Sequence, residues 1–307
     1  MFTSDRFVLG TMMFGLRASA DQIAQIVSRA RELGINEFDT SPSYINGQAQ
    51  LMLSRALKEI RFANAVIHSK VGRSYLPGQP KSEVYVSHHH ISESMNIVEK
   101  CFSDFKIGTV QVHVYNNLPQ LFTAISALAE MNISRNFSGG IGVSNASESI
   151  LKALLNELHI CCPDLNFSCQ RRVALGLDNE DHKILIQYWA YGILNSGTMM
   201  PSAKNVANSR CKTANDKPDI SKRQMTIESS QYYRKACLLC SDYGVNIVDF
   251  AIAYPLLSGY EKVVLGPTRQ WHLDPVERFC DRNYFHAVVA IYEQLQTSVC
   301  HVDYLNH

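Results

Sequence analysis

Short runs of β-prone apolar residues alternate along this chain with longer stretches in which apolar residues recur every three or four positions. Ile23, Ile26 and Val27, for example, fall on one face of an amphipathic helix. The short runs predict strands at residues 7–11, 36–40, 65–70, 109–114, 140–144, 164–170, 184–190 and 262–266. The longer stretches predict helices at residues 20–33, 48–60, 92–105, 119–131, 147–158, 229–243, 247–257 and 284–297.

Repeated strand–helix units predict a parallel sheet, and eight of them predict that the sheet closes into a barrel. The expected fold class is therefore α/β, with residues 1–307 forming a single (β/α)8 TIM barrel domain and a C-terminal helical extension. The alternative is an open doubly wound sheet. It is disfavoured because the turn after the first strand, Gly10–Gly15, lacks the G-x-G-x-x-G pattern of dinucleotide-binding folds.

One polar stretch, from residue 196 to residue 224, interrupts this alternation. It is rich in Lys, Asn and Ser and contains Pro201 and Pro218. A connection of this length within a compact domain is usually functional or disordered. Because the stretch follows the seventh predicted strand, two interpretations stay open: a lid over the site at that end of the barrel, and a surface insertion.

Composition and charge limit the classes of function. With 46% hydrophobic and 19% charged residues, the chain suits a globular protein with a large core. The net charge is +1 and long runs of like charge are lacking, so neither nucleic acid nor membrane is expected as a partner. The N-terminus lacks the layout of a secretory signal, and the nine cysteines are scattered. Both features favour a cytoplasmic protein with reduced thiols.

Four ionisable residues lie at or just beyond the ends of three predicted strands: Asp39, Tyr44, Lys70 and His113. In a parallel barrel these strand ends share one rim, which is where barrel enzymes carry out their chemistry. A lysine beside a tyrosine lowers the phenol pKa from about 10, and an aspartate can hold that lysine by a charge-assisted hydrogen bond. With an imidazole to orient a carbonyl oxygen, the set predicts protonation of that oxygen while hydride reaches the carbon, or the reverse reaction.

The segment Gly34–Tyr44 resembles the G-x-x-x-x-D-T-A-x-x-Y signature of the aldo-keto reductase family, and the resemblance covers most of the chain. It implies an oxidoreductase that interconverts a carbonyl and an alcohol with a nicotinamide cofactor. The family's catalytic residues fall on Asp39, Tyr44, Lys70 and His113, with none substituted.

The resemblance also implies which residues bind the nicotinamide. Residues 140–145 resemble the family's fifth-strand motif, and residues 190–194 resemble its A-Y-S-P-L segment. The implied carboxamide ligands are Ser144, Asn145 and Gln170, the implied stacking residue is Tyr191, and Thr11 and Met12 are implied to lie near the same ring.

Phosphate binding is expected at the loops after strands seven and eight, as in many barrel enzymes. Here these loops are residues 194–197 and the segment from Gly266 to Arg269. The family carries a basic residue for the 2′-phosphate near this position, and the guanidinium of Arg269 can meet a phosphate bidentately. NADP(H) is therefore expected in preference to NAD(H).

Three further motifs bear on the chemistry. The family's Y-G-x-G-x-S-E appears as Tyr44–Gln50, without one glycine and the glutamate, and Ile45 is expected to reshape the pocket. His88–His90 invites a metal interpretation, but a solvated loop before a helix is favoured because no acid or cysteine stands beside it at ligand spacing, so no metal site is expected. Cys237 and Cys240 have the spacing of a redox motif, but their helical pattern favours core packing.

The favoured function is an NAD(P)-dependent aldo-keto reductase or alcohol dehydrogenase that uses Tyr44 as general acid and base. The short connection at residues 114–119 predicts an open pocket, and the signature is most similar to the branch acting on aldoses, sugar lactols and pyridoxal-like compounds. A small carbonyl compound, sugar or sugar derivative is the expected substrate. Two alternatives stay open: a cofactor-sensing regulatory module with little turnover, and a non-redox or epimerising enzyme on the same barrel.

Overall fold

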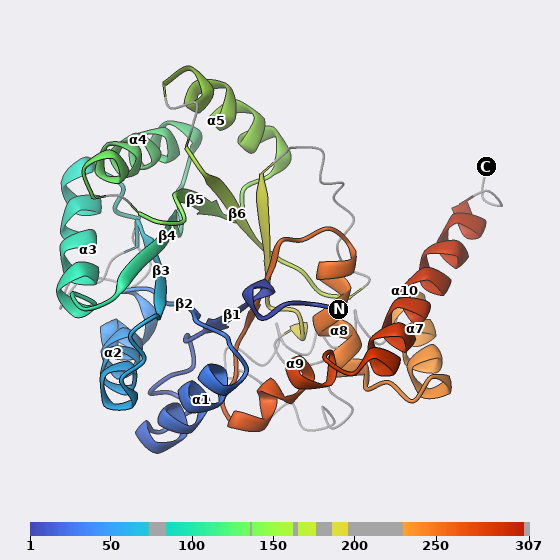
Figure 1. Cartoon of the computed structure of the whole chain (residues 1–307). Helices are drawn as coiled ribbons and strands as arrows, with labels where there is room; N and C mark the ends of the chain where they lie inside the picture. Colours follow the sequence, from blue (N-terminus) through green and yellow to red (C-terminus); the bar gives the residue numbers. More distant parts are fainter. Residues whose placement is uncertain (74–83, 136, 162–164, 176–185, 196–229, 304–307) are drawn as a thin grey trace, which may run out of the picture.

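Parallel strands form a closed barrel in the computed structural model, in which each strand pairs with the next in the chain and the last pairs with the first (Figure 1). The structure describes residues 1–73, 84–135, 137–161, 165–175, 186–195 and 230–303. Its strands are β1 (Phe7–Gly10), β2 (Glu37–Asp39), β3 (Val66–Val71), β4 (Lys106–Val112), β5 (Ile141–Ser144), β6 (Phe167–Arg172), β7 (Gln187–Tyr191) and β8 (Lys262–Leu265). The predicted TIM barrel is confirmed, and the open doubly wound sheet is wrong.

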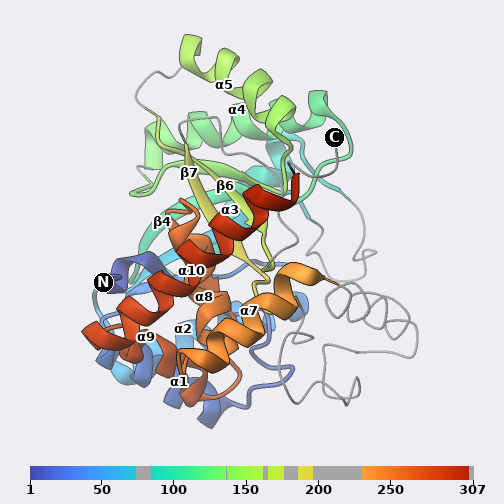
Figure 2. The same ribbon diagram turned by 90° about the vertical axis from the view of Figure 1, so that its right-hand side faces the viewer.

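Helices cover the outside of the barrel, and α1 to α5 follow one another around the strands in Figure 1. The α-helices are α1 (Ala20–Glu32), α2 (Gln48–Ile60), α3 (His88–Cys101), α4 (Leu118–Arg135), α5 (Glu148–Cys161), α7 (Gln231–Asp242), α8 (Ile247–Leu257), α9 (Asp274–Arg278) and α10 (Arg282–Asp303). Among the described residues, short 3-10 turns accompany them at η1 (Ser4–Arg6), η2 (Tyr44–Gly47) and η6 (Gln270–Leu273). Helices α9 and α10 form the C-terminal extension, and α10 packs beside α7 and α8 (Figure 2).

The start of α3 differs from the prediction. The helix begins at His88 and not at residue 92, because the Ser87 hydroxyl caps it by accepting a hydrogen bond from the backbone N–H of His90. The three histidines therefore form the first helical turn and not a loop. His88 pairs with Glu130 and His89 with Glu93, while His90 contacts Ser87. The described residues contain no group of three side chains able to hold a metal ion.

The barrel interior is polar one layer below the predicted catalytic residues. Glu37 and His68 precede Asp39 and Lys70 by two positions, so each pair shares the inward face of its strand. Glu37 accepts hydrogen bonds from Lys262 at 2.5 Å and lies 2.9 Å from His68 Nε2. Because His68 Nδ1 accepts the Thr109 N–H at 2.8 Å, Nε2 carries the proton that Glu37 accepts. This network forms a rigid base for the site above it.

In α7, Cys240 is buried in the core and Cys237 packs against it, and burial raises the pKa of the Cys240 thiol to about 12.

The stretch from residue 196 to residue 224, with its lid and insertion interpretations, lies outside the described residues. No single helix in the described part of the chain is long and apolar enough to cross a membrane, although α7 and α8, bent by 114°, pass that test as a pair.

Candidate active site

The four predicted catalytic residues lie at the carboxyl ends of three neighbouring strands. Asp39 ends β2, Lys70 is the penultimate residue of β3, and His113 directly follows β4. The His113 N–H donates to the carbonyl of Val71 at 2.8 Å, which fixes it beside β3. Tyr44 begins η2, the turn between β2 and α2.

Asp39 and Lys70 form an ion pair in the barrel, with exposed fractions of 4% and 3%. Burial by itself lowers the pKa of the Lys70 ammonium, but the Asp39 carboxylate and Tyr44 outweigh that effect, so the pKa is raised. Gln170 Nε2 donates to the same Asp39 carboxylate oxygen at 3.3 Å. Lys70 is therefore a permanent positive charge, held in place from β2 and β6.

Tyr44 lies against both Lys70 and His113. The Lys70 Nζ is 5.4 Å from the centre of the Tyr44 ring, and the His113 ring meets the Tyr44 ring edge-on at 5.8 Å. Burial raises the pKa of the phenol to about 12, although Lys70 pulls it down. The expected net lowering by Lys70 is wrong for this structure, because desolvation outweighs the ammonium charge. Tyr44 is accordingly a protonated phenol near neutral pH.

His113 is a neutral imidazole. Burial lowers its pKa to about 3, and the positive charges of Lys70 and Arg73 act in the same direction. Its Nδ1 lies 3.3 Å from the Ser43 hydroxyl and 3.5 Å from the Ser41 hydroxyl. Neither serine is among the residues predicted from the sequence, where the available signal was the pair of hydroxyl residues two positions apart within the D-T-S-P-S-Y segment.

A second polar group lies at the ends of β5, β6 and β7. Tyr191 donates its hydroxyl proton to Asn145 Oδ1 at 3.1 Å, and Asn145 Nδ2 donates to Ser144 Oγ at 3.2 Å. Asn145 has a φ of 60°, a left-handed conformation that Asn tolerates better than most residues. Its N–H donates to the Gln170 carbonyl at 2.8 Å, which joins β5 to β6. Gln170 connects this group to Asp39.

Thr11 joins β1 to the same rim. Its backbone N–H and its hydroxyl both donate to the carbonyl oxygen of Asp39, at 2.9 Å and 3.0 Å. Met12 follows in the turn after β1 and is half-buried. The turn is thereby fixed against the strand that carries the ion pair.

Gly266 and Arg269 take no part in the hydrogen bonds that join the other predicted site residues in the described part of the chain. Gly266 follows β8 and is exposed. Arg269 Nη1 donates to the carbonyl of Arg17 at 3.1 Å and to Gln22 Oε1 at 3.2 Å, near the start of α1. Within the described ranges, no carboxylate lies at ion-pair distance from Arg269 and no hydrogen bond joins it to the other predicted site residues.

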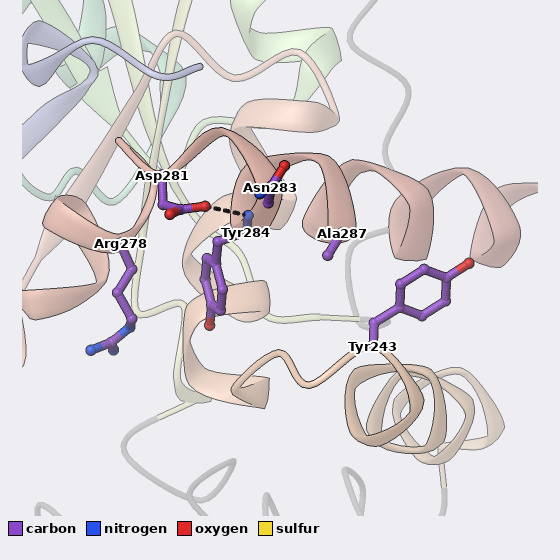
Figure 3. Close-up of a pocket in the computed structure, with 6 residues that line it drawn as sticks. All are labelled: Tyr243, Arg278, Asp281, Asn283, Tyr284 and Ala287. Carbon is purple, nitrogen blue, oxygen red and sulfur yellow. Dashed lines mark hydrogen bonds between the residues drawn. The ribbon is translucent and has the colours of Figure 1, made fainter.

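A surface pocket of about 450 Å³ lies elsewhere, between the end of α7 and the start of α10 (Figure 3). Its lining residues are Tyr243, Arg278, Asp281, Asn283, Tyr284 and Ala287. None of them is a predicted catalytic or cofactor-binding residue. Since Arg278 and Tyr284 are engaged with the buried Asp249, this pocket is a shallow gap beside a structural contact.

The site thus combines a buried ammonium–carboxylate pair with a protonated phenol and a neutral imidazole at the carboxyl-terminal rim of a TIM barrel. The family model described as the aldo/keto reductase family matches residues 6–296, and the chain belongs to this family. The family comprises oxidoreductases that act on carbonyl groups of small molecules.

Comparison with solved structures supports the same fold. The chain is similar to the glycerol dehydrogenase AKR11B4 from Gluconobacter oxydans, with a TM-score of 0.69 and 18% sequence identity over 94% of this chain and 91% of that one. A search among curated proteins found no match.

Proposed function

We propose that this protein interconverts a carbonyl and an alcohol with a nicotinamide cofactor, using Tyr44 as the general acid and base. The observation that carries the proposal is the contact of Tyr44 with both Lys70 and His113 above the Asp39–Lys70 ion pair. A protonated phenol can donate to a carbonyl oxygen as charge develops on it. The fixed ammonium of Lys70 stabilises the phenolate left behind.

The cofactor-binding part of the proposal rests on the donor set at the ends of β5 to β7. Ser144, Asn145 and Gln170 offer a hydroxyl and two carboxamides, which are complementary to the carboxamide of nicotinamide. Tyr191, bonded to Asn145, offers an aromatic face, and Thr11 and Met12 border the same rim. When bound, the nicotinamide would supply or accept the hydride.

The preference for NADP(H) is proposed from the charge of Arg269 beyond β8. Its guanidinium donates only to neutral oxygens of the described residues, so its charge is available to a 2′-phosphate near Gly266. For the substrate, we propose a sugar or another polar carbonyl compound. The short connection from β4 to α4 supports this choice, because it leaves that side of the rim open.

The test begins with titration of the purified protein with NADPH and NADH, followed by nucleotide fluorescence. We expect binding of NADPH, and failure to bind either nucleotide would contradict the proposal. A panel of aldoses, keto-sugars and simple aldehydes then separates an enzyme from a cofactor sensor without turnover. Loss of a sugar's stereochemistry without net oxidation of cofactor would instead identify an epimerising enzyme.

Two variants assign the roles. We expect Tyr44→Phe to lower kcat by at least about 10²-fold while leaving the nucleotide Kd unchanged, because only the proton donor is removed. We expect Arg269→Ala to weaken NADPH binding by about ten- to hundredfold, through loss of charge-assisted hydrogen bonds, and to leave NADH binding nearly unchanged. Equal losses for the two nucleotides would contradict the role given to Arg269.

A further inference from the structure

Two serine hydroxyls and His113 form a connected triangle beside the catalytic tyrosine. The Ser41 and Ser43 hydroxyl oxygens are 2.9 Å apart, and both lie within hydrogen-bond reach of His113 Nδ1, at 3.5 Å and 3.3 Å. The Ser43 backbone N–H donates to Ser41 Oγ at 3.2 Å. Ser41 is 1% exposed, so its hydroxyl proton requires a partner within the protein.

The protons can be assigned by counting donors and acceptors. If Ser41 donates to Ser43 and Ser43 donates to His113 Nδ1, both hydroxyl protons have acceptors. If His113 Nδ1 instead donates to Ser43, the nearer of the two hydroxyls, the buried hydroxyl proton of Ser41 is left without an acceptor among the described residues. Leaving a buried donor unpaired is costly, so the first arrangement is favoured.

We propose that Ser41 and Ser43 are positioning residues that hold His113 in the tautomer with its proton on Nε2. Nδ1 is then the acceptor, and Nε2–H becomes a fixed donor for the carbonyl oxygen of a substrate. This inference rests on the proposed function, since it gives His113 a carbonyl to bind. Ser41 stands where the aldo-keto reductase signature has alanine, so the hydroxyl pair is a feature of this chain and not of the signature.

The chemistry of hydroxyls suits this role better than a carboxylate would. A carboxylate at Nδ1 can only accept, so it would move the proton to Nδ1 and favour the charged imidazolium. Serine can donate and carries no charge. The charged groups that bear on His113 are Lys70 and Arg73, both positive, and they also disfavour an imidazolium. Burial and the two cations therefore keep the imidazole neutral, and the serines set which of its nitrogens donates.

The test measures the tautomer directly, by two-bond ¹H–¹⁵N correlation NMR of the ¹⁵N-labelled full chain. The His113 signals are assigned by their disappearance in His113→Asn. For the wild-type protein we expect one neutral tautomer, with the proton on Nε2, at pH 6 to 8. For Ser43→Ala and for the Ser41→Ala/Ser43→Ala double variant we expect averaging between the two tautomers.

Kinetics gives a second readout. We expect the alanine variants to lower kcat for carbonyl reduction by about tenfold, less than the ~10²–10⁴-fold of a whole acid–base group, because the imidazole is loosened and not removed. Nucleotide Kd stays unchanged, and Ser43→Thr, which keeps the hydroxyl, restores both kcat and the tautomer. Ser69→Ala is the matched control, because Ser69 is a buried serine next to Lys70 whose hydroxyl has no partner in the described structure.

The outcomes separate this inference from the proposed function. A wild-type His113 protonated on Nδ1, or a Ser43→Ala variant with unchanged tautomer and kcat, would overturn the positioning role even if the enzyme is active. A wild-type protein without nucleotide binding or turnover would contradict the proposed function, while the NMR result would still decide the tautomer. Ser43→Ala alone provides the decision if the double variant does not fold.

Discussion

At the scale of single residues, burial decides which site groups carry charge. Burial opposes the ionised form of Tyr44 and raises its pKa to about 12, and it opposes the ionised form of His113 and lowers its pKa to about 3. Lys70 stays charged because Asp39 lies against it. Near neutral pH the site therefore holds one ion pair and two neutral proton donors. In the proposed reaction, the site therefore needs no change of protonation before carbonyl reduction.

The two directions of the proposed reaction should respond differently to pH. Alcohol oxidation requires the Tyr44 phenolate, whose fraction increases about tenfold per pH unit below the pKa. We expect kcat/KM for oxidation to rise with that slope from pH 6 to pH 9, and kcat/KM for reduction to stay flat. His113 contributes no inflection, because its pKa of about 3 lies below this interval.

Initial rates in both directions, measured in one buffer series at constant ionic strength, check this prediction. A plateau of the oxidation rate below pH 8 would mean that the Tyr44 pKa in the working enzyme is near neutral. In that case the effect of Lys70 would exceed that of burial.

Which residues meet at the rim was predictable, but their ionisation was not. Asp39, Lys70 and His113 each end or follow a β-prone run, and parallel strands bring such positions together. The sign of the Tyr44 pKa shift depends on how completely the packed chain excludes water from the phenol, which no local pattern encodes. The contact between Ser43 and His113 likewise joins loops 70 positions apart.

At the scale of elements, the spacing of apolar residues along the sequence located the helices, and the capping residues decided where they begin. The predicted ranges for α2 and α8 agree with the structure at both ends. Helix α3 begins at His88 because Ser87 caps it. The prediction missed this first turn because its three histidines are polar and add nothing to the apolar periodicity. Helix α9 was missed because its five residues are too short for periodicity to show.

The backbone is strained in the turn between Tyr44 and α2. Ile45 and Asn46 both adopt left-handed conformations, with φ of 50° and 55°, and Gly47 follows with φ of 82°. A β-branched residue in this region is an outlier, and the left-handed conformation costs a non-glycine residue about 1–2 kcal/mol. The family pattern has glycine at position 45, so this chain holds Tyr44 at the end of a strained segment.

We predict that Ile45→Gly is more stable than Ile45→Ala by about 0.5–1 kcal/mol, because both lose the side chain and only glycine relieves the positive φ. Thermal unfolding of the two variants measures the difference. Glu59→Gly and Glu59→Ala serve as the control, since Glu59 lies within α2, where alanine should be the more stable. The same order at both positions would contradict the strain assigned to Ile45.

At the scale of the whole molecule, one buried carboxylate connects the C-terminal helices to the barrel. Asp249 in α8 is fully buried and accepts two hydrogen bonds from Arg278 of α9, at 2.5 Å and 2.9 Å. The Tyr284 hydroxyl of α10 donates to the same carboxylate at 2.8 Å. Three helices thus meet at the Asp249 carboxylate, and its two partners, Arg278 and Tyr284, are drawn in Figure 3. Helix α8 in turn packs on β8, the strand that leads to Arg269.

Removing Arg278 should therefore destabilise the whole chain more than an ordinary surface change does. Arg278→Ala leaves Asp249 buried with only the Tyr284 hydroxyl, and we expect a loss of about 3 kcal/mol, the lower end for buried pairs because Arg278 itself is partly exposed. Urea unfolding measures it through the midpoint and slope. Arg55→Ala is the matched control, since Arg55 pairs with Glu59 at 2.8 Å on the exposed face of α2 and its removal should leave the midpoint unchanged. Similar losses in the two variants would mean that Asp249 is not the connection between these helices.

Because α8 supports β8, Arg278→Ala should also weaken NADPH binding before the barrel unfolds, and nucleotide titration at increasing urea concentration would detect that order of events.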